Sequence, residues 1–196
     1  RRLELHFGAT FYKARVFVNG EEVGEHEGGH TAWRADAAAA LAGGRGLVAV
    51  EVDNRPGLAT IPGWAMKLES SGNVWYDWWH YGGIVRDVAL VAHERAAIRR
   101  QEIRTRLGAG PAEVTTRVLV ERFQAGGRLR VDARVLDPGG RAVARAGETV
   151  AGEPGELAVP IRLRVEDPQP WHFDQPRLYR MVVEVQDESG AALDRL

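Results

Sequence analysis

Residues 13–25 read KARVFVNGEEVGE, and this stretch decides how the chain folds. Ala14, Val16 and Val18 fall on alternate positions, which is the spacing of a β-strand with one buried face. Asn19-Gly20 follows directly and tolerates positive φ at both positions, as a type I′ hairpin turn requires. We therefore expect the chain to return antiparallel after the turn and complete a β-hairpin.

Strands are also predicted on both sides of this hairpin. Residues 3–7 alternate apolar and polar side chains, residues 47–53 form a Val-rich run, and residues 84–91 restore the period of two. Asp36 precedes four alanines and is placed to cap one or two helical turns before Gly43-Gly44 ends them. Five or six strands are fewer than a two-sheet jelly roll normally uses, so we expect this domain to be partial, without its first strands.

The composition of the sequence changes after His93, where aromatic residues become less frequent and regular strand patterns begin. Turn signals at residues 137–140 and 188–190 separate several of these strands. About seven short strands of this kind are typical of an immunoglobulin-like sandwich. The predicted strands cover residues 98–107, 114–123, 129–136, 142–146, 157–165, 179–186 and 191–196. The sequence therefore predicts an all-β protein with one domain at residues 1–95 and a second at residues 96–196.

The composition narrows the class of function. The formal net charge is −1, from 26 basic and 27 acidic residues, which gives no electrostatic reason to expect a nucleic-acid or membrane partner. The absence of cysteine excludes disulfides and thiolate chemistry. No apolar run approaches the roughly 20 residues of a membrane span, and Arg1 does not open a signal peptide. We expect no cofactor. The sequence shows no targeting signal, and we favour a cytoplasmic location.

One motif suggests a metal site and is rejected. Residues 26–30 read HEGGH and match the H-E-x-x-H pattern of zinc proteases. That pattern binds a metal only where a helix presents both imidazoles on one face. Two adjacent glycines disfavour a helix by about 1 kcal/mol each, and the segment follows the Asn19-Gly20 turn. We therefore expect a Gly-Gly turn here and no metal ligands.

The candidate site is the aromatic stretch at residues 75–83, which reads WYDWWHYGG. Aromatic rings suit the C–H faces of sugars, and the carboxylate of Asp77 can accept charge-assisted hydrogen bonds from two hydroxyl groups. The surrounding segment, from residue 57 to about residue 81, has no strand or helix period, and loops of that length are usually functional. Alternatively, the rings fill the sandwich interior, the ordinary fate of Trp, and Asp77 caps a turn.

Four stretches carry a resemblance to a known family. Residues 15–30 (RVFVNGEEVGEHEGGH) and residues 77–88 (DWWHYGGIVRDV) resemble the two signatures of the sugar-binding domain of glycoside hydrolase family 2. Residues 47–54 (LVAVEVDN) lie between them in the expected order, and residues 170–179 resemble the tail of the family's immunoglobulin-like domain. The amino-acid sequences of these stretches most resemble those of β-glucuronidases and β-galactosidases. The resemblance implies a galactose-binding-like jelly-roll sandwich followed by an immunoglobulin-like sandwich.

The resemblance also implies a role for Asp77. In this family the matching aspartate reaches from the first domain into the active site of a separate barrel and contacts the sugar there. We therefore expect the substrate-binding residues to be Asp77, Trp78, Trp79 and His80. Tyr81 fits the aromatic pattern that follows the aspartate, whereas His80 replaces the Asn of many glucuronidases. That departure leaves the identity of the sugar open.

The resemblance places catalysis outside this chain. The family is retaining, with an acid and a nucleophile carboxylate about 5 to 5.5 Å apart, and both come from the barrel. The family's acid follows an Asn, yet Asn19, Asn54 and Asn73 are followed by Gly20, Arg55 and Val74. A barrel also needs about 250 residues with regular helices. We therefore expect no catalytic residue in this chain.

Two functions follow as alternatives. The first is a non-catalytic fragment of a retaining β-glycosidase, which takes a β-glycoside together with a downstream catalytic barrel, in a parent protein that assembles as a homo-oligomer. The second is a free-standing carbohydrate-binding module. An adhesion protein is a weaker alternative, because it gives no role to the aromatic stretch.

Overall fold

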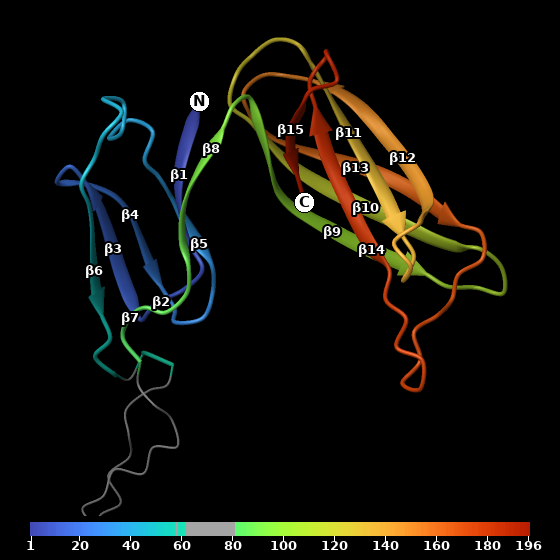
Figure 1. Cartoon of the computed structure of the whole chain (residues 1–196), viewed down its shortest axis with the longest axis horizontal. Coiled ribbons are helices and arrows are strands. Elements are labelled where there is room, and N and C mark those ends of the chain that lie inside the picture. The colour runs from blue at the N-terminus through green and yellow to red at the C-terminus, as the bar shows by residue number, and fades with distance from the viewer. Residues whose placement is uncertain (58, 62–80) are drawn as a thin grey trace, which may run out of the picture. The chain divides into compact units, whose positions relative to one another are not determined.

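A computed structural model of the chain describes residues 1–57, 59–61 and 81–196. Every regular element assigned within these ranges is a β-strand, which confirms the predicted all-β class. The chain divides into two compact units, Arg1–Ala92 and His93–Leu196 (Figure 1). The domain limit expected between residues 95 and 96 stays a prediction. Within the described ranges, no helix has the length and apolar character needed to cross a membrane.

The first unit is built from short strands in two three-stranded sheets and one two-stranded pair. The sheets have the strand orders β4-β3-β6 and β5-β1-β8, and β2 pairs with β7. The strands are β1 (Arg2–Phe7), β2 (Thr10–Phe11), β3 (Lys13–Val18), β4 (Glu21–Glu27), β5 (Trp33–Asp36), β6 (Val48–Asp53), β7 (Gly83–Ile84) and β8 (Val88–His93).

The predicted hairpin is confirmed as β3 and β4. Asn19 and Gly20 have φ values of 53° and 86°, the positive angles that a type I′ turn requires. The Asn19 side chain also ties the turn to a distant loop, because its Nδ2 donates to the Ala40 carbonyl at 2.9 Å and its Oδ1 accepts from the Leu47 N–H at 2.9 Å. Val16 and Val18 are fully buried, as their alternation predicted.

The core of the first unit lies between its two larger sheets. Leu5 and Phe7 from β1 pack with Val16 and Val18 from β3, in a cluster that also includes Ala35 and Ala37. A stack of three rings crosses the same interior. Trp33 stacks on Phe7 with centroids 4.4 Å apart and on His26 at 5.3 Å. Strands from both sheets contribute to the stack, so it joins the two layers.

The strand predicted over residues 84–91 is wrong in one respect, because the structure breaks it in two. β7 pairs with β2, whereas β8 lies beside β1 in another sheet. At the break the Gly8 N–H donates to the Asp87 carbonyl at 2.8 Å, and a Cβ on Gly8 would lie 2.8 Å from the Cβ of Arg86. The chain therefore changes sheets at a crossing that only glycine allows.

Asp36 accepts a backbone hydrogen bond as predicted, but it does not cap a helix. Its Oδ1 accepts the Ala38 N–H at 3.0 Å, and the Leu41 N–H reaches the Ala37 carbonyl at 3.0 Å. The residues that follow form hydrogen-bonded turns and not the one or two helical turns expected.

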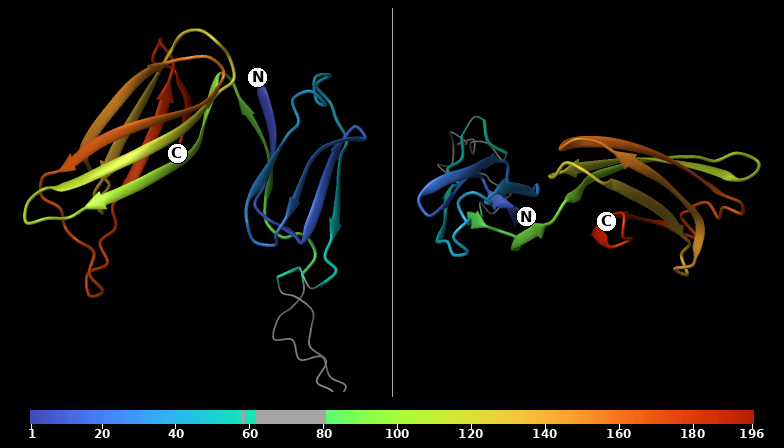
Figure 2. Two further views of the ribbon diagram at one scale, coloured as in Figure 1. Left: turned by 180° about the vertical axis from the view of Figure 1, so that it is seen from behind. Right: turned by 90° about the horizontal axis from the view of Figure 1, so that it is seen from above.

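The second unit is a seven-stranded sandwich, and every strand predicted for it is present. The sheets have the strand orders β13-β10-β9 and β12-β11-β14-β15, and Figure 2 shows them from two further directions. Buried side chains of both sheets, such as Val118 and Ile161 facing Val131 and Val183, form one core. This arrangement is an immunoglobulin-like sandwich. The strands are β9 (Ala96–Arg106), β10 (Ala112–Arg122), β11 (Arg128–Leu136), β12 (Ala142–Ala151), β13 (Gly155–Val165), β14 (Arg180–Gln186) and β15 (Ala192–Arg195).

Candidate functional site

The four residues predicted to bind substrate, Asp77, Trp78, Trp79 and His80, lie outside the described residues. The structure describes the chain on both sides of them, at residues 53–57 and 81–86. We call these two segments, together with the residues that hold them, the loop base. The loop base is therefore the part of the chain next to the predicted site that the structure describes.

The two segments of the loop base are held together at one end of the first unit (Figure 1). β6 ends at Asp53, whose carbonyl accepts the Tyr12 N–H at 3.2 Å. The next residue, Asn54, donates from Nδ2 to the Tyr81 carbonyl at 3.4 Å and so joins the departing chain to the returning one. Gly83 then pairs with Phe11 in the β2–β7 ladder. The intervening stretch is therefore anchored at both ends, by contacts that the sequence pattern did not reveal.

An ion pair fixes the chain where it leaves β6. The Arg55 guanidinium and its backbone N–H both donate to the Asp53 carboxylate, at distances from 2.6 to 3.1 Å. The side-chain hydrogen bond from Arg55 is the main cause that holds the pKa of Asp53 well below its usual range. A carboxylate held ionised in this way is a poor proton donor. Asp53 therefore has a structural role at the loop base and is no candidate for a general acid.

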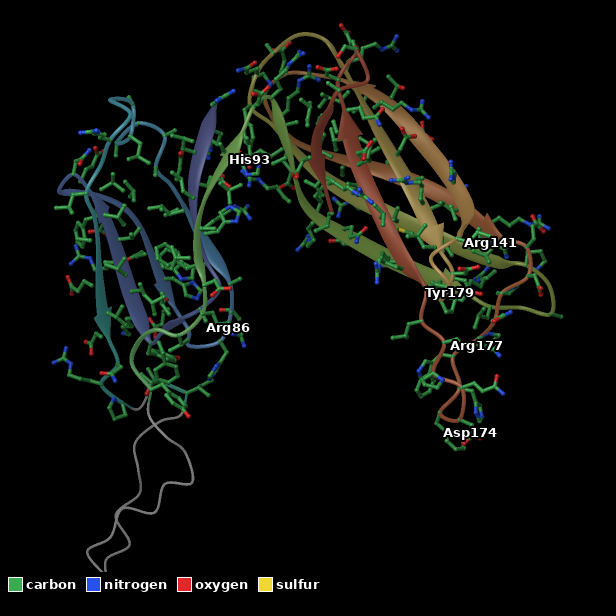
Figure 3. All side chains as sticks on the ribbon, in the orientation of Figure 1. Arg86, His93, Arg141, Asp174, Arg177 and Tyr179 are labelled. Atoms are coloured by element: carbon green, nitrogen blue, oxygen red, sulfur yellow. The ribbon has the colours of Figure 1, made fainter. Side chains whose placement is uncertain are left out.

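A second set of contacts supports the loop base from the β2 side. The buried ring of Phe11 meets the His30 ring edge-on, with centroids 5.6 Å apart, and packs so closely on Gly29 that a Cβ there would overlap the ring. The Arg86 guanidinium, labelled in Figure 3, donates to the His30 carbonyl at 3.3 Å. Arg86, which lies at the break between β7 and β8, therefore ties the returning chain to the segment that follows β4.

The zinc-protease pattern at residues 26–30 does not have the geometry that its chemistry needs. His26 lies in β4, where its ring stacks on Trp33 and its Nε2 lies 3.1 Å from the Thr31 hydroxyl. His30 follows the Gly28-Gly29 turn and meets a different ring, Phe11. The premise of the rejection, an extended backbone in place of a helix, is confirmed.

The loop base exposes aromatic and large aliphatic side chains beside the exposed guanidinium groups of Arg55 and Arg86. Tyr81 is 60% exposed and is the one member of the predicted aromatic cluster that the structure describes. Ile84, which follows it, is also exposed. An exposed phenol ring offers both an apolar face and a hydroxyl group, the combination that suits contact with a sugar. Among the described residues, the loop base therefore combines an exposed phenol ring with an ion pair that has a structural role.

The fold and the loop base define a class of protein: a pair of β-sandwiches in which a long aromatic stretch interrupts the first. The family follows from comparison with known proteins. Residues 1–94 match the family model described as glycosyl hydrolases family 2, sugar binding domain, and residues 96–196 match the model described as glycosyl hydrolases family 2. The chain belongs to glycosyl hydrolases family 2, which confirms the resemblance recognised in the sequence.

Curated relatives are enzymes several times longer than this chain. A β-glucuronidase from Felis catus is 27% identical over an alignment of 172 residues that covers 81% of this chain and 25% of the relative. A β-galactosidase from Thermoanaerobacter pseudethanolicus is 26% identical over an alignment of 189 residues that covers 94% of this chain and 24% of the relative. The chain thus spans about a quarter of the length of these relatives.

Solved structures share the fold over the whole chain. A β-glucuronidase from Bacteroides uniformis has a TM-score of 0.84 at 24% identity, and the match covers 100% of this chain and 23% of that one. A putative β-galactosidase from Bacteroides fragilis has a TM-score of 0.78 at 21% identity, with coverage of 100% and 29%. At these identities the likeness concerns the fold, and it confirms the jelly-roll and immunoglobulin-like pair.

Proposed function

We propose that this chain supplies the non-catalytic sugar-binding and immunoglobulin-like domains of a retaining β-glycosidase of the β-glucuronidase or β-galactosidase type. One observation carries the proposal: both domains match family 2 in order, on a chain that spans about a quarter of relatives named β-glucuronidase and β-galactosidase. Bond cleavage is assigned to a catalytic barrel in the longer protein. The role of this chain is to support that barrel and to contribute a substrate-contacting loop.

The loop base supports the second part of this role. The Asn54 side chain joins the chain that leaves β6 to the chain that returns at Tyr81. Phe11 pairs with Gly83 in the returning chain, and Arg86 donates to the His30 carbonyl. Residues that contact a substrate work best when rigid elements position them, because binding then costs less conformational entropy. We assign the substrate contact to Asp77, with Trp78, Trp79 and His80 beside it.

The chemistry assigned to Asp77 is binding, not proton transfer. An ionised carboxylate accepts hydrogen bonds from two neighbouring sugar hydroxyl groups, and such charge-assisted bonds are about twice as strong as neutral ones. The adjacent indole rings offer flat apolar faces for the C–H side of the same sugar. Together these groups orient a glycoside for carboxylates that belong to the barrel.

The test uses the longer protein that contains this chain, with 4-nitrophenyl β-glucuronide and β-galactoside as substrates. We expect the longer protein to hydrolyse one of them and the 196-residue chain to hydrolyse neither. Asp77→Asn in the longer protein is expected to lower kcat/KM by roughly 10- to 100-fold, since one or two hydrogen bonds to a charged group are lost. Glu153→Gln, which removes an exposed carboxylate between β12 and β13, is the matched control and should leave the rate unchanged.

Two results would contradict the proposal. Turnover by the 196-residue chain would place catalytic groups within it. Full activity of the Asp77→Asn variant would remove the assigned substrate contact. Calorimetry separates the alternative function: binding of glucuronic acid, galactose or an oligosaccharide to the 196-residue chain with a millimolar or lower Kd, abolished by Asp77→Ala, would indicate a free-standing carbohydrate-binding module.

A further inference from the structure

The turn between β3 and β4 contains the only Asn-Gly pair in the sequence, at Asn19-Gly20. The backbone nitrogen of Gly20 can attack the side-chain Cγ of Asn19, because glycine has no side chain to hinder the approach. The new N–C bond closes a succinimide ring, and the amide nitrogen leaves as ammonia with the proton of the Gly20 N–H. Water then opens the ring to aspartate or isoaspartate. The turn therefore carries a site at which the chain can be deamidated.

The fold occupies both ends of the Asn19 side-chain amide. Its Nδ2 donates to the Ala40 carbonyl at 2.9 Å, and its Oδ1 accepts the Leu47 N–H at 2.9 Å. The Asn19 N–H also donates to the Leu47 carbonyl at 2.9 Å. Residues 37–47 join β5 to β6, so these three hydrogen bonds tie that connection to the hairpin turn (Figure 1). We call the three hydrogen bonds the clasp.

Packing helps to keep the clasp closed. Ala40 and Leu41 pack against the core cluster of the first unit. Gly46 lies so close to the same surface that a Cβ there would overlap the Leu41 side chain and lie 3.1 Å from Cγ1 of Val18. The connection is therefore held to the hairpin by apolar contacts as well as by the clasp.

The clasp opposes the attack that leads to deamidation. Asn19 and Gly20 are both exposed, so water reaches the turn and burial gives no protection. To form the ring, the Cγ of Asn19 must swing toward the Gly20 nitrogen, and this movement breaks both side-chain hydrogen bonds of the clasp. The reaction then proceeds from molecules in which residues 37–47 have opened. Its rate follows the fraction of open molecules, as it does for other local openings.

Neither product of the reaction can restore the clasp. Aspartate has no Nδ2 donor and would bring a carboxylate oxygen against the Ala40 carbonyl oxygen, two acceptors without a proton between them. Isoaspartate routes the backbone through the side chain and lengthens the turn. The positive φ values of Asn19 and Gly20, 53° and 86°, would then no longer match the β3–β4 hairpin.

We propose that Asn19-Gly20 is a deamidation site that the clasp protects. The Asn19 amide persists while residues 37–47 are closed on the turn, and a molecule that reacts during an opening cannot close again. Deamidation therefore marks, irreversibly, the molecules in which this part of the first unit has opened. The inference goes beyond the proposed function and uses no residue of the loop base, so either can fail alone.

Mass spectrometry of the 196-residue chain, followed over time at neutral pH, tests the protection. We expect Asn19 to deamidate about 10-fold or more slowly in the folded chain than in the chain unfolded in urea. Leu41→Ala removes packing that holds the connection and should raise the folded-state rate several-fold, with circular dichroism to check that the chain stays folded. Gly43→Ala is the matched control on the same connection and should keep the parent rate, because nothing lies within 4 Å of a Cβ there.

The variant Asn19→Asp tests the second half of the inference, because it has the side chain of one product from the start. We expect a lower melting temperature and faster hydrogen exchange at the Leu47 amide, which loses the closed clasp. Ala39→Asp adds a carboxylate at an exposed position of the same connection and is the charge-matched control. It should leave both measurements unchanged.

Four results would overturn the inference. Equal deamidation rates in the folded and the unfolded chain would show that the clasp gives no protection. An Asn19 amide that persists in both states would remove the site. A Leu41→Ala variant with faster exchange at Leu47 but the parent deamidation rate would rule out opening as the route. An Asn19→Asp variant with the melting temperature and Leu47 exchange of the parent would show that the product closes again.

Discussion

The two units differ in how completely they bury their apolar side chains. Among the described residues, fifteen buried side chains form the core cluster of the second unit and six form that of the first. In the first unit, β6 and β8 leave apolar side chains exposed, including Val48, Val88 and Leu90. In the second unit, the exposed large apolar side chains other than the terminal Leu196 lie at the end of β9 and on the connection between β13 and β14: Ile103, Leu107, Trp171, Phe173 and Leu178.

This difference shows that the alternation of apolar and polar residues along a strand does not by itself determine which side chains are buried. Val118 and Val120 on β10 are fully buried, whereas Val88 and Leu90 show the same spacing on β8 and are exposed. A strand buries its apolar face only where a second layer covers it. The expectation that the first domain lacks strands upstream of residue 1 stays a prediction.

The largest expected effect is the loss of core packing in the second unit. Ile161 is buried between the two sheets, and Ile161→Ala should lower the free energy of unfolding by about 2–5 kcal/mol, because it removes buried methyl groups and leaves a cavity. Urea unfolding followed by circular dichroism measures the change. The matched control Leu90→Ala should stay within about 0.5 kcal/mol, since that side chain is already exposed. Equal effects of the two variants would break the contrast between the units.

A smaller effect is expected from a close contact in the first unit. The Cβ introduced by Gly29→Ala would overlap the ring of Phe11, which is buried and has little room to move. Overpacking of this kind typically costs about 1–3 kcal/mol. Gly43→Ala is the matched control, because nothing lies within 4 Å of a Cβ there. If both variants have the melting temperature of the parent, the loop base is loosely packed. The difference in packing between the two units is then larger than described.

The smallest expected effect is electrostatic and lies in a turn of the second unit. Hydrogen bonds from the Ser189 hydroxyl and from the Ala191 and Ser189 N–H groups lower the pKa of Asp187. Because the folded-state pKa is lowered, the stabilisation is present above the ordinary pKa, near 4, and is lost as the pH falls through the folded value. Asp187→Asn should therefore lower the melting temperature at pH 7 and have a shrinking effect below about pH 4. A decrease in melting temperature that stays constant from pH 7 to below about pH 4 would show that the charge of Asp187 does not stabilise the turn. Glu153→Gln is the control.

Local patterns predicted most of the strands correctly. The alternation of residues 14, 16 and 18 and the positive φ of Asn19-Gly20 depend on neighbours along the chain, so the hairpin was readable from the sequence. The seven strands of the second unit were readable for the same reason. The break between β7 and β8 was not, because it depends on Gly8 meeting Arg86 across the sheet.

For the candidate site too, the sequence supplied one part of the description and the structure supplied another. The sequence supplied Asp77 and its aromatic neighbours through a resemblance, and those positions lie outside the described residues. The structure supplied the contacts that hold the loop base, Asn54 with Tyr81 and Arg86 with His30. No spacing in the sequence indicates these partners, because each pair is far apart along the chain.

The sequence by itself determined most of the strands and turns, the family and the aromatic stretch, since each of these depends on residues close together in the chain. Only the tertiary structure decided which strands share a sheet, which apolar faces are covered, and that Ile103 and Leu107 meet Trp171 around one pocket. The physical reason is that burial and surface patches depend on which distant segments come together, and a period of two is the same whether or not a second layer covers it.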